Sequence, residues 1–240
     1  DYRFCFIVQV EGASQGESDA ENVVLSAEGN NIYDAVAVIE VGVPYQLNFG
    51  RANYMLFSKE VAETGYIARF IDESFKNLGV RRSTKLMVVL GDSLDYCTGV
   101  VSKDNPNTSK RQYSILRDYV SEGLTPITNI AMFTQNVNAK RGDNIVTLGA
   151  TDDSIQNEKI TGSSQDNELN PNGTTAGVER TGGLRAYYMG CAVFDGGTMK
   201  GVLSGRDTEI ILMAKGMFHA GRITLHHEGG EGHMVLLLKG

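Results

Sequence analysis

The segment Leu184–Gly221 constrains the fold more than any other part of the sequence. Aromatic and β-branched residues in Tyr187–Phe194 predict a strand, and Asp195-Gly196-Gly197 has the residue types of a hairpin turn. Met199–Leu203 is the expected return strand. A helix is predicted next, because five apolar residues form one face at helical spacing: Ile210, Ile211, Met213, Ala214 and Met217. The segment is therefore predicted to fold as a hairpin, a helix and an outgoing strand in direct succession.

The start of this helix has a recognisable cap. Ser204 stands three residues before Asp207, which approximates a capping box in which the serine side chain accepts a free backbone N–H. Asp207 and Thr208 then lie in the first helical turn, and Gly216 or Gly221 can end the helix. The segment contains no obvious catalytic residue, so its importance is expected to be structural.

Composition excludes several classes of function. The chain has 240 residues, which is enough for one large domain or two modest domains, and it contains no apolar run of the length that a membrane-spanning helix needs. Its net charge is −7 and it has no run of Lys and Arg, so nucleic acid is not expected as a partner. The adjacent Arg81 and Arg82 are interpreted as a solvated loop.

The three cysteines favour a reduced protein. Cys5, Cys97 and Cys191 are odd in number, far apart and each in an apolar context, so we expect reduced core thiols and not a disulfide. No signal peptide is present, and Asp1 leads directly into a predicted strand. We therefore expect that a targeting segment has been removed from this sequence.

Strands and helices alternate in the first half of the chain, which predicts an α/β layer unit. The predicted strands are Tyr2–Val10, Val23–Ala27, Ala52–Phe57 and Lys85–Leu90, and the predicted helices are Ile32–Ile39 and Tyr66–Leu78.

The second half of the chain, after a boundary between Asp92 and Thr108, is also predicted to contain both strands and helices. Its predicted elements are a helix from Asp92 to Val101, a helix Thr108–Glu122, strands Ile145–Leu148, Arg222–His227 and His233–Leu238, and the hairpin and helix described above. Residues 151–183 are polar and without periodicity, so they are predicted to form a mobile loop.

The predicted fold class is α+β (mixed α/β), with two small domains, 1–97 and 98–240. Each is expected to have a mixed β-sheet with helices packed on it, and the second to contain the polar loop and a C-terminal hairpin.

Possible sites of chemistry have simpler interpretations. A hairpin would bring His226 or His227 opposite His233, which makes a surface metal site conceivable, but cross-strand surface histidines are favoured because the spacing is not that of a metal motif. The acidic pairs Asp152-Asp153 and Asp166/Glu168 lack the pattern of a calcium loop. No nucleotide-binding glycine motif or nucleophile motif is present. No catalytic, cofactor-binding or metal-binding residue is therefore predicted.

The sequence resembles the C-subunit family of bacterial spore germinant receptors, the Ger(x)C or GerAC-type lipoproteins. Residues at family positions in the segment are Gly190, Ala192, Val193, Phe194, Lys200, Gly201, Leu203, Asp207, Thr208 and Gly221. Earlier matches follow in the same order: Ser26–Gly29, Leu47, Phe49, Gly50, Glu60, Ala62 and Gly65. Asp207 replaces the family's usual Glu, and Arg51 stands where the family has His. By the same resemblance, the apolar Ile127–Phe133 is expected to contain a strand.

The resemblance implies a non-enzymatic extracytoplasmic subunit of a nutrient germinant receptor. Such a subunit would lie at the outer face of the inner spore membrane, held by a lipid anchor upstream of this sequence, and would assemble with two polytopic membrane subunits. The structural or interaction candidates that it implies are Gly190, Phe194, Gly201, Asp207, Thr208 and Gly221. The alternative is an extracytoplasmic small-molecule-binding or hydrolase domain, which clustered acid, base or nucleophile residues in a pocket would indicate.

Overall fold

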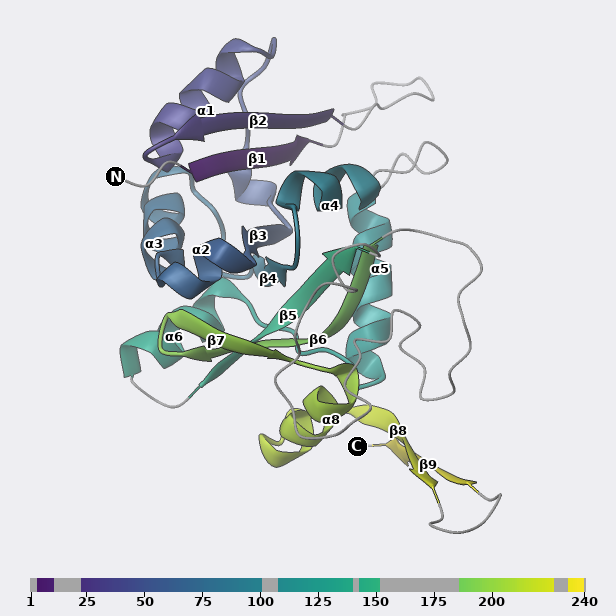
Figure 1. Ribbon diagram of the computed structural model, residues 1–240. Helices are drawn as coiled ribbons and strands as arrows, with labels where there is room; N and C mark the ends of the chain where they lie inside the picture. Colours follow the sequence, from purple (N-terminus) through teal and green to yellow (C-terminus); the bar gives the residue numbers. More distant parts are fainter. Residues whose placement is uncertain are drawn as a thin grey trace.

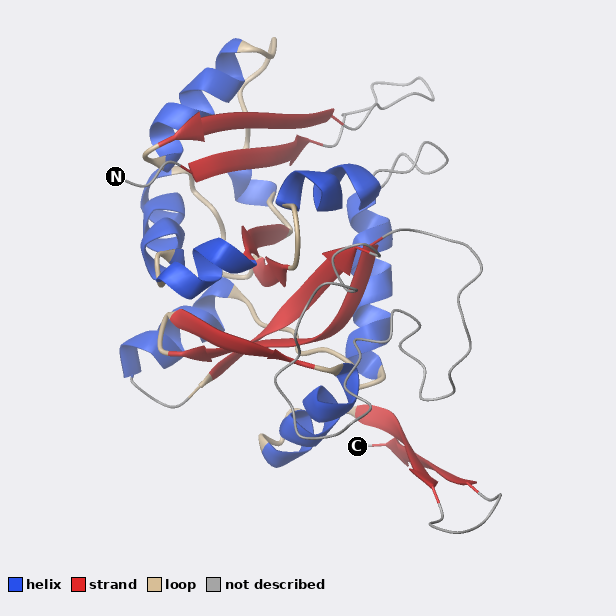
Figure 2. Ribbon diagram, viewed as in Figure 1, coloured by secondary structure: helices blue, strands red, loops and turns tan. Residues whose placement is uncertain are grey.

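A five-stranded mixed sheet forms the centre of the computed structural model (Figures 1 and 2). The structure describes residues 4–10, 23–100, 108–139, 143–151, 186–226 and 233–239. The strand order is β3-β4-β5-β6-β7, in which β3, β4 and β5 are parallel and β6 and β7 continue the sheet antiparallel. The strand bounds are β3 (Tyr54–Ser58), β4 (Lys85–Val89), β5 (Asn144–Thr151), β6 (Ala186–Asp195) and β7 (Thr198–Leu203).

Two antiparallel strand pairs lie outside this sheet. The first joins β1 (Phe4–Val10) to β2 (Val23–Gly29), and the second joins β8 (Ala220–His226) to β9 (His233–Lys239). The β8–β9 pair projects from the lower end of the molecule in Figure 1. Its backbone register places His226 opposite His233.

Helices cover both faces of the central sheet. The helices α2 (Lys59–Thr64), α3 (Ile67–Asn77) and α6 (Ile130–Ala139) cover one face, and α4 (Ser93–Val100) and α5 (Thr108–Ser121) cover the other. The remaining helices are α1 (Ile32–Val41), the short η1 (Phe49–Arg51) and α8 (Gly205–Ala214). None of the helices within the described residues is both long enough and apolar enough to span a bilayer.

Strand β4 is buried on both faces. Leu86 and Val88 pack into the core under α2, α3 and α6, whereas Met87 and Val89 pack into the core under α4 and α5. These four residues are 2% exposed or less, because alternate side chains of a strand point to opposite faces and both faces are covered. The continuous apolar sequence of β4 therefore follows from its internal position in the sheet.

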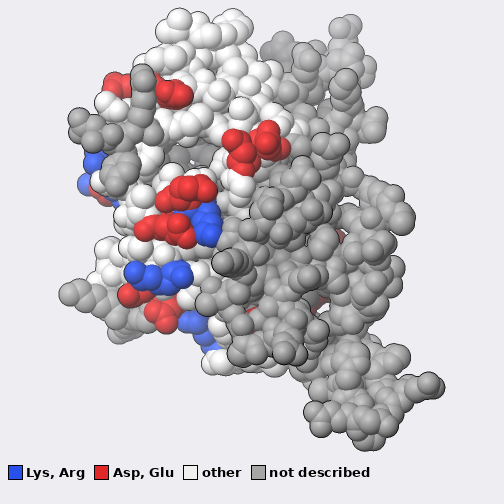
Figure 3. Space-filling view, in the orientation of Figure 1, with Lys and Arg blue, Asp and Glu red and all other residues white. Residues whose placement is uncertain are grey.

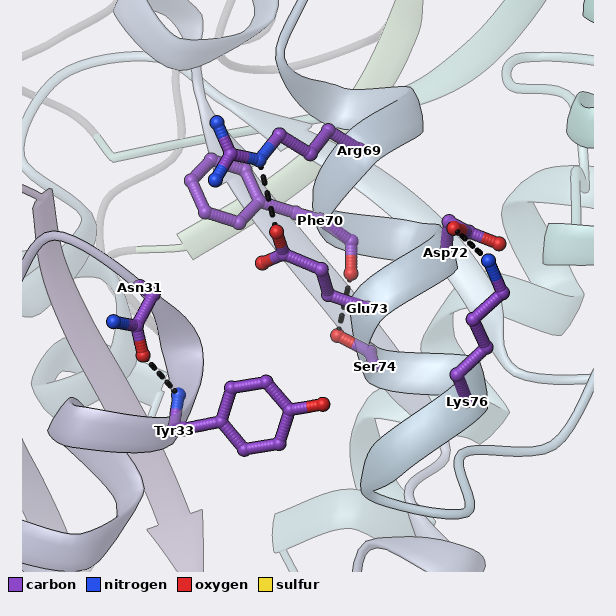
Figure 4. Close-up of polar contacts among 8 residues, drawn as sticks. All are labelled: Asn31, Tyr33, Arg69, Phe70, Asp72, Glu73, Ser74 and Lys76. Carbon is purple, nitrogen blue, oxygen red and sulfur yellow. Dashed lines mark hydrogen bonds and ion pairs between the residues drawn. The ribbon is translucent and has the colours of Figure 1, made fainter.

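The N-terminal unit packs against this arrangement. Asn31 caps α1, and its side chain accepts the N–H groups of Tyr33 and Asp34 at 3.0 and 2.9 Å. Figure 4 shows Asn31, which precedes α1, and Tyr33 on α1 beside α3. The aromatic rings of Phe4 and Phe6 on β1 meet the ring of Phe70 edge to face, with centroids 4.9 and 5.7 Å apart. These contacts hold the β1–β2 pair and α1 against α3.

Most of the predicted elements, and the mixed α+β class, are confirmed. The hairpin of β6 and β7 turns at Gly196 and Gly197, and its helix begins after Ser204 as expected. The predicted polar loop lies outside the described residues except for Thr151, so its mobility stays a prediction.

Two expectations need correction. A separate sheet in each half of the chain was expected, but β3 and β4 from residues 1–97 join β5, β6 and β7 from residues 98–240 in one sheet. The apolar pattern could not reveal this, because strand pairing between distant segments leaves no local signal. The strand expected within Ile127–Phe133 is also wrong, since helix α6 begins at Ile130. The Asn129 side chain accepts the N–H of Met132 at 2.9 Å and starts that helix.

Gly190 marks an irregularity where several segments meet. Its φ angle is +78°, and a β-carbon built on it would lie 2.1 Å from the carbonyl oxygen of Leu203. The register of β6 against β5 shifts by one residue beside it, which is the geometry of a β-bulge. Its N–H donates to the carbonyl of Leu124 at 3.0 Å, and its carbonyl accepts the hydroxyl of Thr125 at 2.9 Å. Any side chain here would clash with the backbone at the end of β7, at Leu203 and Ser204.

We therefore predict that Gly190→Ala destabilises the chain by about 3 kcal/mol or more, because strain at positive φ adds to the steric clash. Gly196→Ala is the matched control. Gly196 also has a positive φ, +59°, but a β-carbon there meets no atom within 4 Å. Its cost should be about 1–2 kcal/mol. Urea unfolding of both variants measures the difference, and equal midpoints for the two would contradict this assignment.

Candidate functional site

The six candidate residues belong to one folding unit, made by β6, β7, α8 and the first residues of β8. Gly190 and Phe194 lie on β6, Gly201 lies on β7, and the other three are Asp207 and Thr208 on α8 and Gly221 on β8. The structure thus brings them into consecutive elements of one unit. Their role in an interaction stays a prediction.

Phe194 is a core residue. It is 0% exposed, and its ring meets the ring of Phe133 on α6 edge to face with centroids 5.3 Å apart. This contact fixes the end of β6 beneath α6. Phe194 cannot contact a partner directly, so any effect of replacing it would pass through the fold.

Gly201 lies beside a second β-bulge. Val193 pairs with Gly201 but Phe194 pairs with Met199, so Lys200 is the extra residue on β7. A bulge increases the local twist of the strand. The bulged Lys200 side chain is exposed at the edge of the sheet.

Gly221 allows close packing around Phe218. A β-carbon on Gly221 would lie 2.5 Å from the Phe218 ring, and one on Gly123 would lie 2.6 Å from the same ring. Gly123 follows the end of α5, so Phe218 sits between that helix end and the start of β8. Two glycines therefore determine how closely the β8–β9 pair approaches the body of the protein.

The start of α8 is a closed network of hydrogen bonds. The Ser204 hydroxyl accepts the N–H of Asp207 at 3.2 Å and donates to the Asp207 carboxylate at 2.8 Å. The Thr208 hydroxyl donates to the Ser204 carbonyl at 2.7 Å and lies 3.3 Å from the sulfur of Cys191. Asp207 is half-buried and Thr208 is fully buried. The capping expected from the sequence is confirmed, and it also joins α8 to β6.

The cysteines are free, and two of them are unsuited to nucleophilic chemistry. Burial raises the pKa of the Cys97 thiol and of the Cys191 thiol to about 11 in each case. Cys5 differs from the expectation of a core thiol, because its side chain is exposed on β1. Its pKa is also raised, first by partial burial and then by the carboxylates of Glu28 and Asp92.

A group of tyrosines under α4 was not anticipated from the sequence. Tyr96 is hydrogen-bonded to Tyr188, and its hydroxyl lies 3.4 Å from the sulfur of Met87. Gly149 leaves room for this ring, since a β-carbon there would be 3.1 Å from the Tyr96 hydroxyl. The neighbouring Tyr54 has a buried hydroxyl with no hydrogen-bond partner among the residues that the structure describes. Burial raises the pKa of all three tyrosines, so they are neutral. They come from separate elements, and no spacing in the sequence could have linked them.

Within the described ranges, no three His, Cys, Asp or Glu side chains are grouped so that they could hold a metal ion. His227 from the conceivable C-terminal site lies outside these ranges, as do Asp152-Asp153 and Asp166/Glu168.

Comparison with known families assigns the class of the protein. Residues 2–150 match the family described as "Spore germination protein N-terminal domain", so the chain belongs to this family of spore germination proteins. Within that class it is the N-terminal portion of a GerAC-type C-subunit of a germinant receptor.

A solved structure entitled "Crystal Structure of the GerBC protein" is similar to the chain with a TM-score of 0.48 and 11% sequence identity. The alignment covers 94% of this chain and 60% of that chain, so the chain spans about 60% of the length of that structure. No curated protein matches the sequence.

The cap of α8 gives a stability prediction. Replacing Asp207 with Lys removes the carboxylate that accepts the Ser204 hydroxyl and places a positive charge at the positive end of the helix dipole. The expected loss of stability is about 1–2 kcal/mol. Thermal unfolding of the isolated chain measures it, with Asp207→Asn as the control that keeps the side-chain size and a cap acceptor. An unchanged melting temperature for Asp207→Lys would count against the cap.

Thiol labelling provides a second prediction. A thiol with a pKa of about 11 has roughly one thiolate in a thousand at pH 8, and buried sulfurs are also shielded from the reagent. Native protein at pH 8 should therefore react at Cys5 only, and denatured protein at all three cysteines. Mass spectrometry of the labelled sites distinguishes these patterns. Rapid native labelling of Cys191 would show that the α8–β6 contact opens readily.

Proposed function

We propose that this chain is part of a non-enzymatic, extracytoplasmic subunit of a nutrient germinant receptor, and that it acts through assembly with other proteins. The observation that carries this proposal is the family match over residues 2–150, which includes β3, β4, β5 and most of the helices. The part of the sequence that defines the family thus contains the buried centre of the fold.

The character of the candidate residues supports a role without chemistry. Phe194 and Thr208 are buried, Gly190 and Gly221 allow close packing, and Asp207 caps a helix. Each of these side chains or glycines holds one element against another. The unit of β6, β7 and α8 would therefore serve the receptor by keeping a neighbouring surface in its correct shape.

The proposed partners are two polytopic membrane subunits, and the proposed location is the outer face of the inner spore membrane. The anchor would be a lipidated cysteine upstream of Asp1, because Cys5 lies within β1, paired with Glu28 of β2. A lipidated residue inside a paired strand would have to leave the sheet.

Affinity purification of the epitope-tagged subunit from detergent-solubilised spore membranes tests this proposal. Both polytopic subunits, each detected with its own antibody, should be recovered with it. A tagged, unrelated spore lipoprotein is the control for capture through detergent micelles. Recovery of neither subunit above this control would overturn the proposal.

Spores that carry Asp207→Lys test the structural role of the unit. Germination should slow only in proportion to the reduced amount of receptor, because the change weakens folding and leaves the partner surface intact. Germination rate and quantified receptor abundance are measured in the same spores. Normal abundance with abolished germination would instead make Asp207 a direct functional residue.

A further inference from the structure

Three chain segments meet at the amino-terminal end of β4, namely residues 49–54, 75–86 and 123–136. Backbone hydrogen bonds join them: Lys85 N–H to Asn53 carbonyl at 3.0 Å, Leu86 N–H to Thr128 carbonyl at 2.8 Å, Ile130 N–H to Thr84 carbonyl at 3.0 Å, and Ala131 N–H to Arg82 carbonyl at 3.0 Å. The Thr84 hydroxyl adds a bond to the Ala52 carbonyl at 3.0 Å. We call the surface made by these segments the basic edge.

The charge of the basic edge is opposite to that of the whole chain. The three segments contain no Asp or Glu, although the chain carries 29 of these residues and a net charge of −7. They contribute Arg51, Arg81 and Arg82, which are exposed, and Lys85, which is half-buried. A fifth cation, Lys76, is already paired with Asp72 at 2.6 Å (Figure 4). Cations are thus concentrated on segments that contain no Asp or Glu, and the neighbouring Asp72 is paired with one of them, Lys76.

Two of these cations are held against aromatic rings. The Arg82 guanidinium lies 5.0 Å from the centre of the Phe75 ring, and the Lys85 ammonium lies 4.6 Å from the centre of the Tyr113 ring. No carboxylate among the described residues forms an ion pair with Arg51, Arg81, Arg82 or Lys85. Stacking restricts the side chains without neutralising them, so less entropy is lost when an anion binds.

Large apolar side chains lie around the same cations. Phe75, Tyr113, Ile127 and Met132 are each between 36% and 45% exposed. Ile127 and Met132 flank the segment that is hydrogen-bonded to residues 82–86. Aromatic residues, Met and Arg are the types enriched in the centres of protein interfaces. By contrast, in the lower part of the described surface shown in Figure 3, positive and negative side chains lie close together.

We propose that the basic edge docks an acidic segment of a partner polypeptide that also carries apolar side chains. This inference rests on the proposed function, in which the partner is one of the polytopic receptor subunits, and it identifies the surface of this chain that the subunit contacts. A planar guanidinium fixed on a ring suits the paired oxygens of a carboxylate. A polypeptide is favoured over an anionic membrane because the rest of this acidic chain would be repelled by such a surface.

The test uses Arg81→Glu/Arg82→Glu and a control with the same change of charge, Arg117→Glu/Lys200→Glu. Arg117 on α5 is exposed and, among the described residues, forms an ion pair with the adjacent Asp118 at 3.7 Å, and Lys200 is exposed on β7. Both double variants should melt near the wild-type temperature, because none of the four side chains is buried. Arg81→Gln/Arg82→Gln, which removes the charge without reversing it, should give an intermediate effect on binding.

The first measurement is recovery of the polytopic subunits with the tagged protein from spore membranes. Arg81→Glu/Arg82→Glu should lower this recovery about tenfold, and the control should leave it unchanged. If the wild type recovers the subunits and Arg81→Glu/Arg82→Glu recovers them equally, the basic edge is not the docking surface, although the proposed function stands. If the wild type recovers none, the proposed function fails, and the docking chemistry is decided by the second measurement.

The second measurement uses two defined probes and the purified chain. A synthetic peptide of alternating Glu and Leu should bind at low salt, with Kd raised about tenfold in Arg81→Glu/Arg82→Glu and unchanged in the control. Absence of this difference would overturn the proposal.

Vesicles that contain phosphatidylglycerol are the other probe. Sedimentation with vesicles that is lost in Arg81→Glu/Arg82→Glu, without peptide binding, would identify the edge as a membrane-facing surface and refute the polypeptide partner.

Discussion

Burial of β4 on both of its faces is the constraint on which the rest of the structure depends. A strand with Leu86 and Val88 on one face and Met87 and Val89 on the other needs a helical layer on each side. The chain meets this need with α2, α3 and α6 on one face and α4 and α5 on the other. The position of α5 in turn brings Gly123 against Phe218 and the start of β8.

Close backbone approach at glycine holds the unit of β6, β7 and α8 in this frame. Gly190 meets the carbonyl of Leu203, and Gly65 after α2 would place a β-carbon 2.8 Å from the Thr198 hydroxyl oxygen at the start of β7. The β6–β7 hairpin contacts the end of α2 through Gly65, and it contacts the link after α5 through the hydrogen bond from the Gly190 N–H to the Leu124 carbonyl. A rigid scaffold of this kind suits a subunit whose surface must keep its shape to be recognised. The basic edge lies on this scaffold, at the amino-terminal end of β4.

The sequence predicted the helices and strands better than it predicted which strands pair and which segments are neighbours. Residue types around Ile32 and the cap at Ser204 are local signals, and they located the starts of α1 and α8. Pairing of β4 with β5 is set by burial across distant segments, so the sequence suggested two sheets where one exists. Likewise, Arg81-Arg82 reads as a solvated pair in isolation. Only the fold shows which segments lie beside this pair. Those segments contain no Asp or Glu and expose Phe75 and Met132.

Continuity of the sheet has a consequence for synthesis of the chain. Strand β4 ends at Val89, but its partner β5 begins at Asn144, more than fifty residues later. During translation or secretion, β3 and β4 can pair while the other edge of β4 still lacks its partner. An apolar strand with a free edge invites pairing with other chains until the missing neighbour emerges. The nascent protein therefore has an interval in which helices can cover the faces of β4 while its edge toward β5 is still unpaired.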